Sequence, residues 1–504
     1  MRADVVVVGG GGSGLAAAVG AANKGARVIL LEKNPECGGT TACSIGSISS
    51  TQTEYQRRAG IVDSPAEHYA DMDLFLEVRK ISRPDNNGLR RLLTENVPET
   101  MRWLGAMGVV FYGPLEEKPH RKPRMHNVMP NSRAYIFHLE REARRLGVTI
   151  INGAQAKRFV TSGRQVTGVE FLVNGNLQTV QASRCVVLAS GDYAADPEFK
   201  REFISPEIAA TEAINPTSTG DGQRMAQELG AKIINGDMWS GGMRFIRPAK
   251  PAWVSQLPPS RWLMKAANFA LRWAPGFISR RFIMSFLTTV LVPTPKMYAS
   301  GAILINKKGE RFTSETKGMP YELPNQPEGM AYIFFDANIA EKFSQWPNYI
   351  STAPGIAYAF LPDYRRNRPD LFNRADTIQE LAAQIGVPPD VLAKTIENYN
   401  KGAGETDANV SVPARGERPA IIRSPFYALG PCKNYVHYTE GGLAVSDKLE
   451  VLDADGKPIP GLLAAGSVGQ GGGLLKGHGH HLGWAFTSGR LAGQFAAARQ
   501  VGES

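Results

Sequence analysis

The chain has 504 residues, too many for one ordinary domain and enough to bury a large core. Its net charge at pH 7 is +10, and its four cysteines form no Cys-x-x-Cys pair and no metal-binding spacing. This argues against a disulfide framework and fits a reducing compartment. No apolar run reaches the ~20 residues that would cross a bilayer, and a strand begins almost at once. We therefore expect a cytoplasmic protein without a signal peptide, either free or attached to the inner face of the membrane.

The first 32 residues carry a dinucleotide-binding pattern. A short apolar strand, residues 5–8, leads into the motif Gly9-x-Gly11-x-x-Gly14, a helix of small residues follows over 15–23, and a second apolar strand ends at Glu32. Such glycines let the backbone turn tightly and approach a pyrophosphate, which sits at the positive N-terminus of the helix. The Glu32 carboxylate is placed to accept hydrogen bonds from a ribose. This stretch predicts the start of a Rossmann-like domain.

Glycine-rich and hydroxyl-rich segments recur along almost the whole chain. They lie at residues 37–46 (CGGTTACSIG), 189–192 (ASGD), 219–222 (TGDG), 300–312 (SGAILINKKGERF), 441–445 (GGLAV) and 459–467 (IPGLLAAGS). Through these segments the chain resembles flavoproteins of the succinate dehydrogenase/fumarate reductase superfamily, which includes the 3-ketosteroid dehydrogenases. The resemblance implies FAD. It also implies that the FAD is non-covalent, because residues 41–44 lack the flavin-linking histidine of the membrane complexes.

The motif and the resemblance together place the cofactor-binding residues in both halves of the chain. They are Gly9, Gly11, Gly12, Ser13, Gly14, Glu32, Lys33, Gly39, Thr40, Thr41, Ser44, Gly46, Ala156, Ala189, Gly191, Asp221, Gly466, Ser467 and Leu482. We expect an α/β fold with an α+β cap: a Rossmann-like FAD-binding domain over residues 1–232 and 425–504, and an inserted substrate-binding or capping domain over 233–424. Helices are expected over 134–146, 377–385, 389–401 and 485–499, the last packing on the first Rossmann helix.

The positive charge is concentrated between Asp237 and Glu310, where no acidic residue occurs. The eleven basic residues there are Arg244, Arg247, Lys250, Arg261, Lys265, Arg272, Arg280, Arg281, Lys296, Lys307 and Lys308. One interpretation is a helix over 261–273 in a membrane interface, with a second short apolar segment, 282–292, beside it. The other is an amphipathic helix packed on its own domain. Peripheral membrane contact through 250–295 thus stays open, whereas nucleic acid is not expected because the basic stripe is narrow.

Two arginines of the fumarate reductases have no counterpart in this sequence. The resemblance places a proton-donating arginine a few residues after Arg311-Phe-x-x-Glu315, where this chain has Met319. It places a carboxylate-binding arginine near residues 477–483, where this chain has histidines and glycines instead. The sequence therefore argues against a fumarate reductase.

The spacing Gly477-x-Gly479-x-x-Leu482 is similar to that of the 3-ketosteroid dehydrogenases. In those enzymes a Pro-Tyr pair supplies a tyrosine base, and the pair ending at Tyr321 resembles it, two residues later than usual. A tyrosine has a pKa near ~10, so Tyr321 would need a cation such as Lys317, or a histidine, to stabilise its phenolate. The alternative is a tyrosine that only packs in the cap.

The tyrosine that holds the ketone oxygen in the ketosteroid enzymes is missing from residues 473–476. The groups available there are Lys476, His478, His480 and His481, and we choose His478 for the ketone contact, since a histidine can stabilise a developing enolate as a phenol does. Three histidines in four residues resemble a metal cluster. Alternating glycines and the lack of an acidic partner argue against one, so no metal is expected.

A further histidine, His437, lies in a segment similar to the His-Tyr-Thr-Met-Gly-Gly of succinate and fumarate enzymes, whose histidine binds a substrate carboxylate. His437 is therefore a candidate for holding a carboxylate or carbonyl; otherwise it hydrogen-bonds the flavin or the backbone. Tyr112 could reach the same cleft from the N-terminal side. The catalytic candidates are thus Tyr321, His478, His437 and Tyr112.

These observations predict an FAD-dependent dehydrogenase that introduces a C=C bond next to a ketone on a cyclic, largely apolar substrate, of the ketosteroid or cyclohexanone keto-acid type. Tyr321 would take the α-proton while a hydride leaves the β-carbon for flavin N5. The electron acceptor is a quinone, a carrier protein or oxygen. Two alternatives remain: a fumarate-reductase-like reductase of an unsaturated carboxylate or enone, and a binding subunit that keeps FAD without catalysis.

Overall fold

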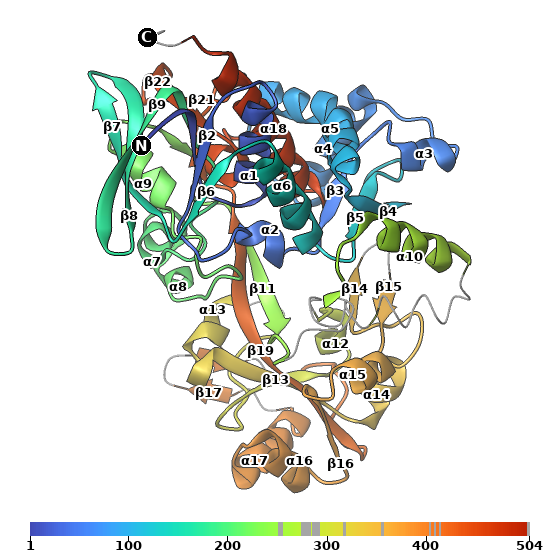
Figure 1. Cartoon of the computed structure of the whole chain (residues 1–504). Helices are drawn as coiled ribbons and strands as arrows, with labels where there is room; N and C mark the ends of the chain where they lie inside the picture. Colours follow the sequence, from blue (N-terminus) through green and yellow to red (C-terminus); the bar gives the residue numbers. More distant parts are fainter. Residues whose placement is uncertain are drawn as a thin grey trace.

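A parallel sheet and an antiparallel sheet form the two halves of the molecule (Figure 1). The computed structural model describes residues 1–249, 256–273, 284, 293–315, 319–353, 357–402, 405–407, 410–412 and 415–500. The expected α/β fold, with a Rossmann-like sheet and a separate capping sheet, is confirmed. The apolar segment 282–292, expected beside the basic helix, lies outside the described residues except for Met284. Lys317, the proposed partner of Tyr321, also lies outside them.

The parallel sheet runs in the order β21-β22-β9-β1-β2-β6. β8 also pairs with β9, and β7 pairs with β8. Its strands are β1 (Arg2–Val8), β2 (Val28–Glu32), β6 (Thr149–Asn152), β7 (Gln155–Ser162), β8 (Gln165–Val173), β9 (Asn176–Leu188), β21 (Glu450–Leu452) and β22 (Pro458–Ala464). β1 pairs in parallel with β2 and β9, and β9 with β22. The central strands are near-continuous runs of buried Val, Leu and Ile, as expected for strands covered on both faces.

The parallel pairing brings the carboxyl ends of four strands to one edge of the sheet. The register sets Val8 of β1 beside Leu188 of β9, and Leu188 beside Ala464 of β22. The glycine-rich segments that follow these strands and β2 therefore meet, although they are hundreds of residues apart in the sequence. Open parallel sheets bind their ligands at this edge.

Helices cover the parallel sheet, and a small antiparallel sheet lies beside them (Figure 1). The helices are α1 (Gly12–Ala22), α2 (Gly39–Cys43), α3 (Glu54–Arg58), α4 (Pro65–Val78), α5 (Asn87–Met107), α6 (Arg133–Arg145), α7 (Pro197–Phe199), α8 (Pro206–Ala209), α9 (Asp221–Gln227) and α18 (His480–Ala498). The small sheet consists of β3 (Ser47–Ser49), β5 (Met125–Met129) and β4 (Val110–Leu115). α6 lies where a helix was expected, and α18 begins five residues before the expected start at 485.

α1 and α18 approach each other through glycines. A Cβ at Gly493 would lie 2.0 Å from the Ala17 carbonyl oxygen, and a Cβ at Gly20 would lie 2.5 Å from the Arg490 carbonyl oxygen. Only a residue without a side chain permits this approach. The expected packing of the C-terminal helix on the first Rossmann helix is confirmed.

We expect Gly493→Ala to lower the free energy of unfolding by about 2–3 kcal/mol, because the added methyl group must push two helix backbones apart. The matched control is Gly105→Ala in α5, where a Cβ would meet nothing within 4 Å. There alanine should raise the free energy of unfolding by about 0.5–1 kcal/mol, since it is the better helix former. Chemical denaturation of the three proteins measures both effects, and equal stability of the two variants would contradict the close helix contact.

The antiparallel sheet is built around one long strand, β19 (Phe426–Thr439), which pairs with three others. Those are β11 (Trp239–Phe245), β13 (Met330–Phe335), which also pairs with β12 (Ile303–Asn306), and β16 (Phe372–Ala375). Around it lie α12 (Lys296–Ala299), α13 (Met319–Glu322), α14 (Ala337–Lys342), α15 (Leu361–Asn367), α16 (Ile378–Ile385) and α17 (Pro389–Asn400). α16 and α17 lie where helices were expected. Three strand pairs stand apart: β14 (Ser351–Ala353) with β15 (Ala357–Ala359), β17 (Glu405–Asp407) with β18 (Val410–Val412), and β10 (Ile233–Ile234) with β20 (Gly442–Leu443).

The two halves have separate apolar cores, one around the parallel sheet and two around the antiparallel sheet. The predicted domain boundary between residues 424 and 425 falls just before β19. β19 itself pairs with β11 and β13 of the predicted cap, and the chain continues from it to β20. The division into 1–232 with 425–504 and 233–424 stays a prediction. Within the described ranges, no helix combines the length and the apolar character needed to span a membrane.

Candidate functional site

A cavity of about 380 Å³ lies at the carboxyl edge of the parallel sheet and reaches residues of β11 and β19. Seventeen of the nineteen predicted cofactor residues line it: Gly9, Gly11, Gly12, Ser13, Glu32, Lys33, Gly39, Thr40, Thr41, Ser44, Gly46, Ala156, Ala189, Gly191, Asp221, Ser467 and Leu482. The cavity thus gathers the segments that follow β1, β2, β9 and β22. Their role in binding the cofactor stays a prediction.

The other two predicted cofactor residues, Gly14 and Gly466, support the cavity wall from behind. A Cβ at Gly14 would lie 1.8 Å from the Gly9 carbonyl oxygen, so the turn that starts α1 cannot hold a larger residue there. Gly466 has a φ of +69°, and its Cβ would lie 2.5 Å from Ser13 Oγ. Both glycines therefore shape the backbone that a nucleotide would approach.

Acidic and basic groups mark the nucleotide end of the cavity. Glu32 Oε2 accepts a hydrogen bond from the Gly10 backbone N–H at 2.6 Å, and Glu32 Oε1 accepts from the Asn34 backbone N–H at 2.8 Å. Oε1 also accepts from Asn34 Nδ2 at 2.7 Å. These bonds hold the carboxylate at the end of β2, where Oε2, with one hydrogen bond, keeps a lone pair for a ribose hydroxyl. Lys33 forms an ion pair with Asp221 at 2.8 Å.

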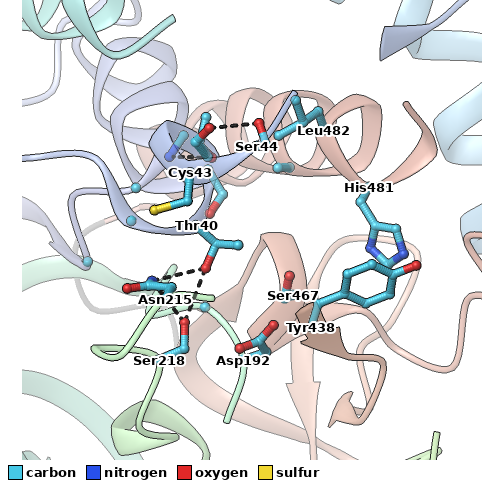
Figure 2. A pocket seen from close by; sticks show the side chains of 18 of the residues that line it. Thr40, Cys43, Ser44, Asp192, Asn215, Ser218, Tyr438, Ser467, His481 and Leu482 are labelled. Atoms are coloured by element: carbon cyan, nitrogen blue, oxygen red, sulfur yellow. Dashed lines mark hydrogen bonds between the residues drawn. The ribbon is translucent and has the colours of Figure 1, made fainter. Parts of the chain in front are cut away.

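Small hydroxyl side chains form the wall between the two ends of the cavity (Figure 2). Asn215 Nδ2 donates to Thr40 Oγ1 and to Ser218 Oγ, each at 3.0 Å. A Cβ at Gly12 would lie 2.6 Å from Thr41 Oγ1, so a larger residue would push against the Thr41 side chain. A cavity lined by glycine and small hydroxyls, with Glu32 in its wall, fits FAD.

At the other end, cations and histidines line the cavity: Arg79, Arg244, Lys476, His437, His478 and His481, together with Tyr438 and Ser240. Lys476 is buried and forms an ion pair with Glu440. Arg244 of β11 has no carboxylate within ion-pair distance among the described residues, and its buried Nε lacks a hydrogen-bond partner there. Desolvation, followed by repulsion from Arg247, lowers the pKa of Arg244 to about 10, which leaves it protonated at neutral pH.

His437 of β19, like His481, is a further polar group in this wall that has an unpartnered atom. Its Nε2 is buried and has no hydrogen-bond partner among the described residues. Burial, and then the charge of Arg244, lower the pKa of His437 to about 3, so its ring is neutral at physiological pH. A neutral imidazole beside a guanidinium without a counter-ion is an arrangement suited to an anionic ligand.

The three histidines that follow one another in the sequence point to three different places. His478 Nδ1 lies 2.6 Å from Glu117 Oε1, and its backbone N–H donates to the same oxygen at 2.8 Å. The His481 ring lies 4.2 Å from the Tyr438 ring, measured between centroids, and faces it in the cavity (Figure 2). His480 turns the other way, into the protein, where it is buried.

His480 joins a buried cluster with His68 and His120, the one group of three His, Cys or acidic residues in the described ranges whose ligand atoms lie close enough for a metal. Its Nδ1 accepts from the Gly477 backbone N–H at 3.1 Å, and His120 Nδ1 lies 3.0 Å from Arg124 Nη1. Because arginine only donates, both rings carry their proton on Nε2, the atom that would bind the metal. His480 Nε2 lies 3.1 Å from His68 Nε2 and donates to it. These hydrogen bonds favour a hydrogen-bonded cluster over a metal site, and the absence of a metal stays a prediction.

The two tyrosines proposed as catalytic do not line the cavity. Tyr321 lies on α13 and is 46% exposed. Tyr112 of β4 packs against the buried side chains of Val110, Met129 and Met264. The structure brings His437 and His478 to the same cavity, whereas the roles assigned to the two tyrosines stay predictions.

The sequence did not indicate Arg79, Arg244, Glu117, Tyr438 or Asp192 as site residues. Arg244 occurs in the basic stretch, but nothing in the spacing separates it from the other ten cations there. Glu117 belongs to no motif. Asp192 ends the recognised segment 189–192, but it was not chosen as a site residue; burial raises its pKa to about 6. Strand pairing and loop packing, which the sequence does not display, bring four of these side chains to the cavity and bring Glu117 to His478.

Comparison with protein families decides the identity of the cofactor. The profile described as "FAD binding domain" matches residues 4–242 and 263–479, which is most of the chain. The chain belongs to this family. It is therefore a flavoprotein, and the resemblance to the succinate dehydrogenase/fumarate reductase superfamily is confirmed together with FAD as its cofactor. The absence of a covalent link stays a prediction.

Relatives of this flavoprotein differ in the direction of the reaction that their names state. The NADH:fumarate oxidoreductase of Klebsiella pneumoniae is 27% identical over 99% of this chain, but the chain spans only 48% of that protein. The 4-oxocyclohexanecarboxylate 2-dehydrogenase of Sinomonas cyclohexanicum is 26% identical over 99% of this chain and 93% of its own length. The open conformation of a flavocytochrome c3 fumarate reductase has the same fold, with a TM-score of 0.71 at 24% identity, over 98% of this chain and 78% of that one.

Proposed function

We propose that this flavoprotein is an oxidoreductase that acts on the CH–CH bond of a small substrate carrying both a carboxylate and a ketone. We further propose that it works as a dehydrogenase, introducing a double bond next to the ketone of a ring keto acid. The observation that carries the proposal is the pair Arg244 and His437 in the cavity wall. A buried Nε and a buried Nε2 without partners, beside a cation without a counter-ion, leave a place for a carboxylate.

The substrate carboxylate would be held by Arg244, with His437 donating a hydrogen bond from its neutral ring. Both residues lie on neighbouring strands, β11 and β19, which pair from Trp239 to Phe245. Strands fix the position of a side chain more rigidly than loops do, so the anchored carboxylate would set the orientation of the ring. The 4-oxocyclohexanecarboxylate dehydrogenase, a relative that this chain covers almost fully, has a name that fits such a substrate.

His478 would take the proton from the carbon beside the ketone. Glu117, which is buried, accepts from the ring at Nδ1, so Nε2 is left free to act as the base. Lys476 would stabilise the negative charge that develops on the ketone oxygen. Bound FAD supplies the acceptor for the hydride of the neighbouring carbon. The exposed Tyr321 is not needed for this proton transfer.

The affinity for a ring carboxylate should stay constant from about pH 7 to about pH 9, because Arg244 remains charged and His437 remains neutral over that range. The shift in the flavin spectrum on titration with cyclohexanecarboxylate measures it at each pH. Below about pH 7 the anion should bind more tightly, because Asp192 of the same cavity, whose pKa is raised to about 6, loses its charge. In Asp192→Asn the affinity should be flat at low pH as well, and tighter binding of this variant below ~6.5 would contradict a neutral His437.

The proposed function is tested by anaerobic titration of the oxidised holoenzyme with four saturated compounds. They are 4-oxocyclohexanecarboxylate, cyclohexanone, cyclohexanecarboxylate and a saturated 3-ketosteroid. The proposal predicts that the flavin is bleached by the keto acid, while the ring carboxylate binds without bleaching. Bleaching by the steroid alone would show that the carboxylate site is not used. The dehydrogenase direction is wrong if no compound bleaches the flavin and the dithionite-reduced enzyme is reoxidised by fumarate or an enone.

A further inference from the structure

Among the described residues, helix α10 (Arg261–Trp273) packs on the protein through the side that carries Met264 and Asn268. Met264 is 1% exposed and packs with Val110 and Met129. Asn268 is also buried, and its Nδ2 donates to the Phe111 carbonyl oxygen of β4 at 2.7 Å. This side holds the helix in a fixed orientation beside β4 (Figure 1).

The opposite side of α10 presents large apolar side chains to solvent. Trp262 is 79% exposed, Phe269 is 67% exposed and Leu263 is 43% exposed. Single exposed apolar residues are ordinary, but a cluster that includes two aromatic rings on one helix marks an interaction surface. If α10 were only an amphipathic helix packed on its own domain, these aromatic side chains would lie on the buried side.

Two cations, Arg261 and Lys265, flank these apolar residues, and both are exposed. In the described part of the chain neither forms an ion pair, and Lys265 Nζ lies 5.8 Å from the centre of the Trp262 ring. The surrounding sequence, residues 238–309, has eleven basic and no acidic residues. The surface formed by Arg261, Trp262, Leu263, Lys265 and Phe269, which we call the α10 face, is therefore positively charged and apolar at once.

We propose that the α10 face docks on the surface of an anionic lipid bilayer. Aromatic rings favour the boundary between headgroups and acyl chains, and lysine and arginine on the same helix meet the anionic headgroups above it. A nucleic acid would leave the aromatic and leucine side chains largely unpaired, because its backbone is contacted by cations and polar groups. The absence of acidic residues from the sequence on either side of the helix, residues 238–309, complements the negative charge of such a membrane.

The test is flotation of the holoenzyme with vesicles of phosphatidylcholine, and with vesicles that contain equal parts of phosphatidylcholine and phosphatidylglycerol. Wild-type protein should float with the anionic vesicles and much less with the neutral ones. We expect Arg261→Glu with Lys265→Glu, and separately Trp262→Ser with Phe269→Ser, to lower binding about tenfold or more. Added salt should weaken binding of the wild type, since screening reduces the attraction to headgroups.

The controls make the same change in net charge, or remove one exposed aromatic side chain, elsewhere on the protein. They are Lys24→Glu with Lys394→Glu, both exposed, and Trp346→Ser, at a tryptophan that is 64% exposed. These should bind as the wild type does, and flavin content reports that each variant is folded. The proposal is overturned if the wild type does not float with anionic vesicles, or if both α10 variants bind like the controls. Stronger retention on double-stranded DNA than on anionic vesicles would also overturn it.

Discussion

Arg244→Gln is expected to weaken the binding of 4-oxocyclohexanecarboxylate by about 30- to 1,000-fold, or about 2–4 kcal/mol. The variant removes a charge that no carboxylate of the described structure neutralises, so the ligand would lose its main ionic partner. Glutamine retains hydrogen-bond donors and most of the volume, which separates the loss of charge from a loss of packing. Perturbation of the flavin spectrum by the ligand gives the dissociation constant of each protein.

The matched control for this variant is Arg247→Gln, three residues after Arg244. Arg247 is exposed and donates to the Ile214 carbonyl oxygen at 3.0 Å, and it does not line the cavity. Its replacement should leave the dissociation constant unchanged within about twofold. Binding of cyclohexanone, which has no carboxylate, should be equally weak in all three proteins. Unchanged keto-acid binding in Arg244→Gln would show that the carboxylate is held elsewhere.

His478→Ala is expected to slow flavin reduction by the keto acid about 10²- to 10⁴-fold, because it removes the proposed general base. Substrate binding should change little, since Arg244 and His437 remain. Glu117→Gln should have a smaller effect, about 10- to 100-fold, because it weakens the orientation of the ring without removing it. Stopped-flow absorbance of the flavin measures the rate, and the same experiment gives the affinity from its concentration dependence.

A matched control separates the pair of Glu117 and His478 from a general effect of changing this loop. Glu116→Gln is the control for Glu117→Gln: its side chain is exposed and adjacent in the sequence, and it should reduce at the wild-type rate. A wild-type rate in His478→Ala would show that His478 is not the base, and Tyr321 would again be the candidate.

The nucleotide half of the site could be predicted because its information is local. Each glycine-rich turn follows directly after an apolar strand, and parallel strands deliver those turns to one edge whatever their distance in the sequence. Residues as remote as Gly9 and Ser467 were therefore assigned to one cavity, which they line. Gly14 was also assigned to the cavity, although it lies behind the residues that line it. The glycine motif does not distinguish a lining residue from one that supports the turn.

The substrate half depends on information that is not local. Arg244 reaches the cavity because β11 pairs with β19, whose residues are almost 200 positions later. Spacing also could not separate His478, His480 and His481: α18 starts at His480, and successive helical residues point in directions about 100° apart. His480 therefore enters the core while His481 faces the cavity. The sequence alone does not tell which side of α10 is buried. The contact with β4 shows it.

The most direct test of the account is the single turnover of the holoenzyme with 4-oxocyclohexanecarboxylate deuterated at the carbon that would lose the hydride. The account predicts anaerobic flavin reduction that is slower than with the unlabelled acid, and one equivalent of the unsaturated keto acid per flavin. The Arg244→Gln enzyme should need far more substrate for the same turnover. An oxidised flavin that stays unreduced at saturating keto acid, together with rapid oxidation of the reduced enzyme by fumarate, would contradict it.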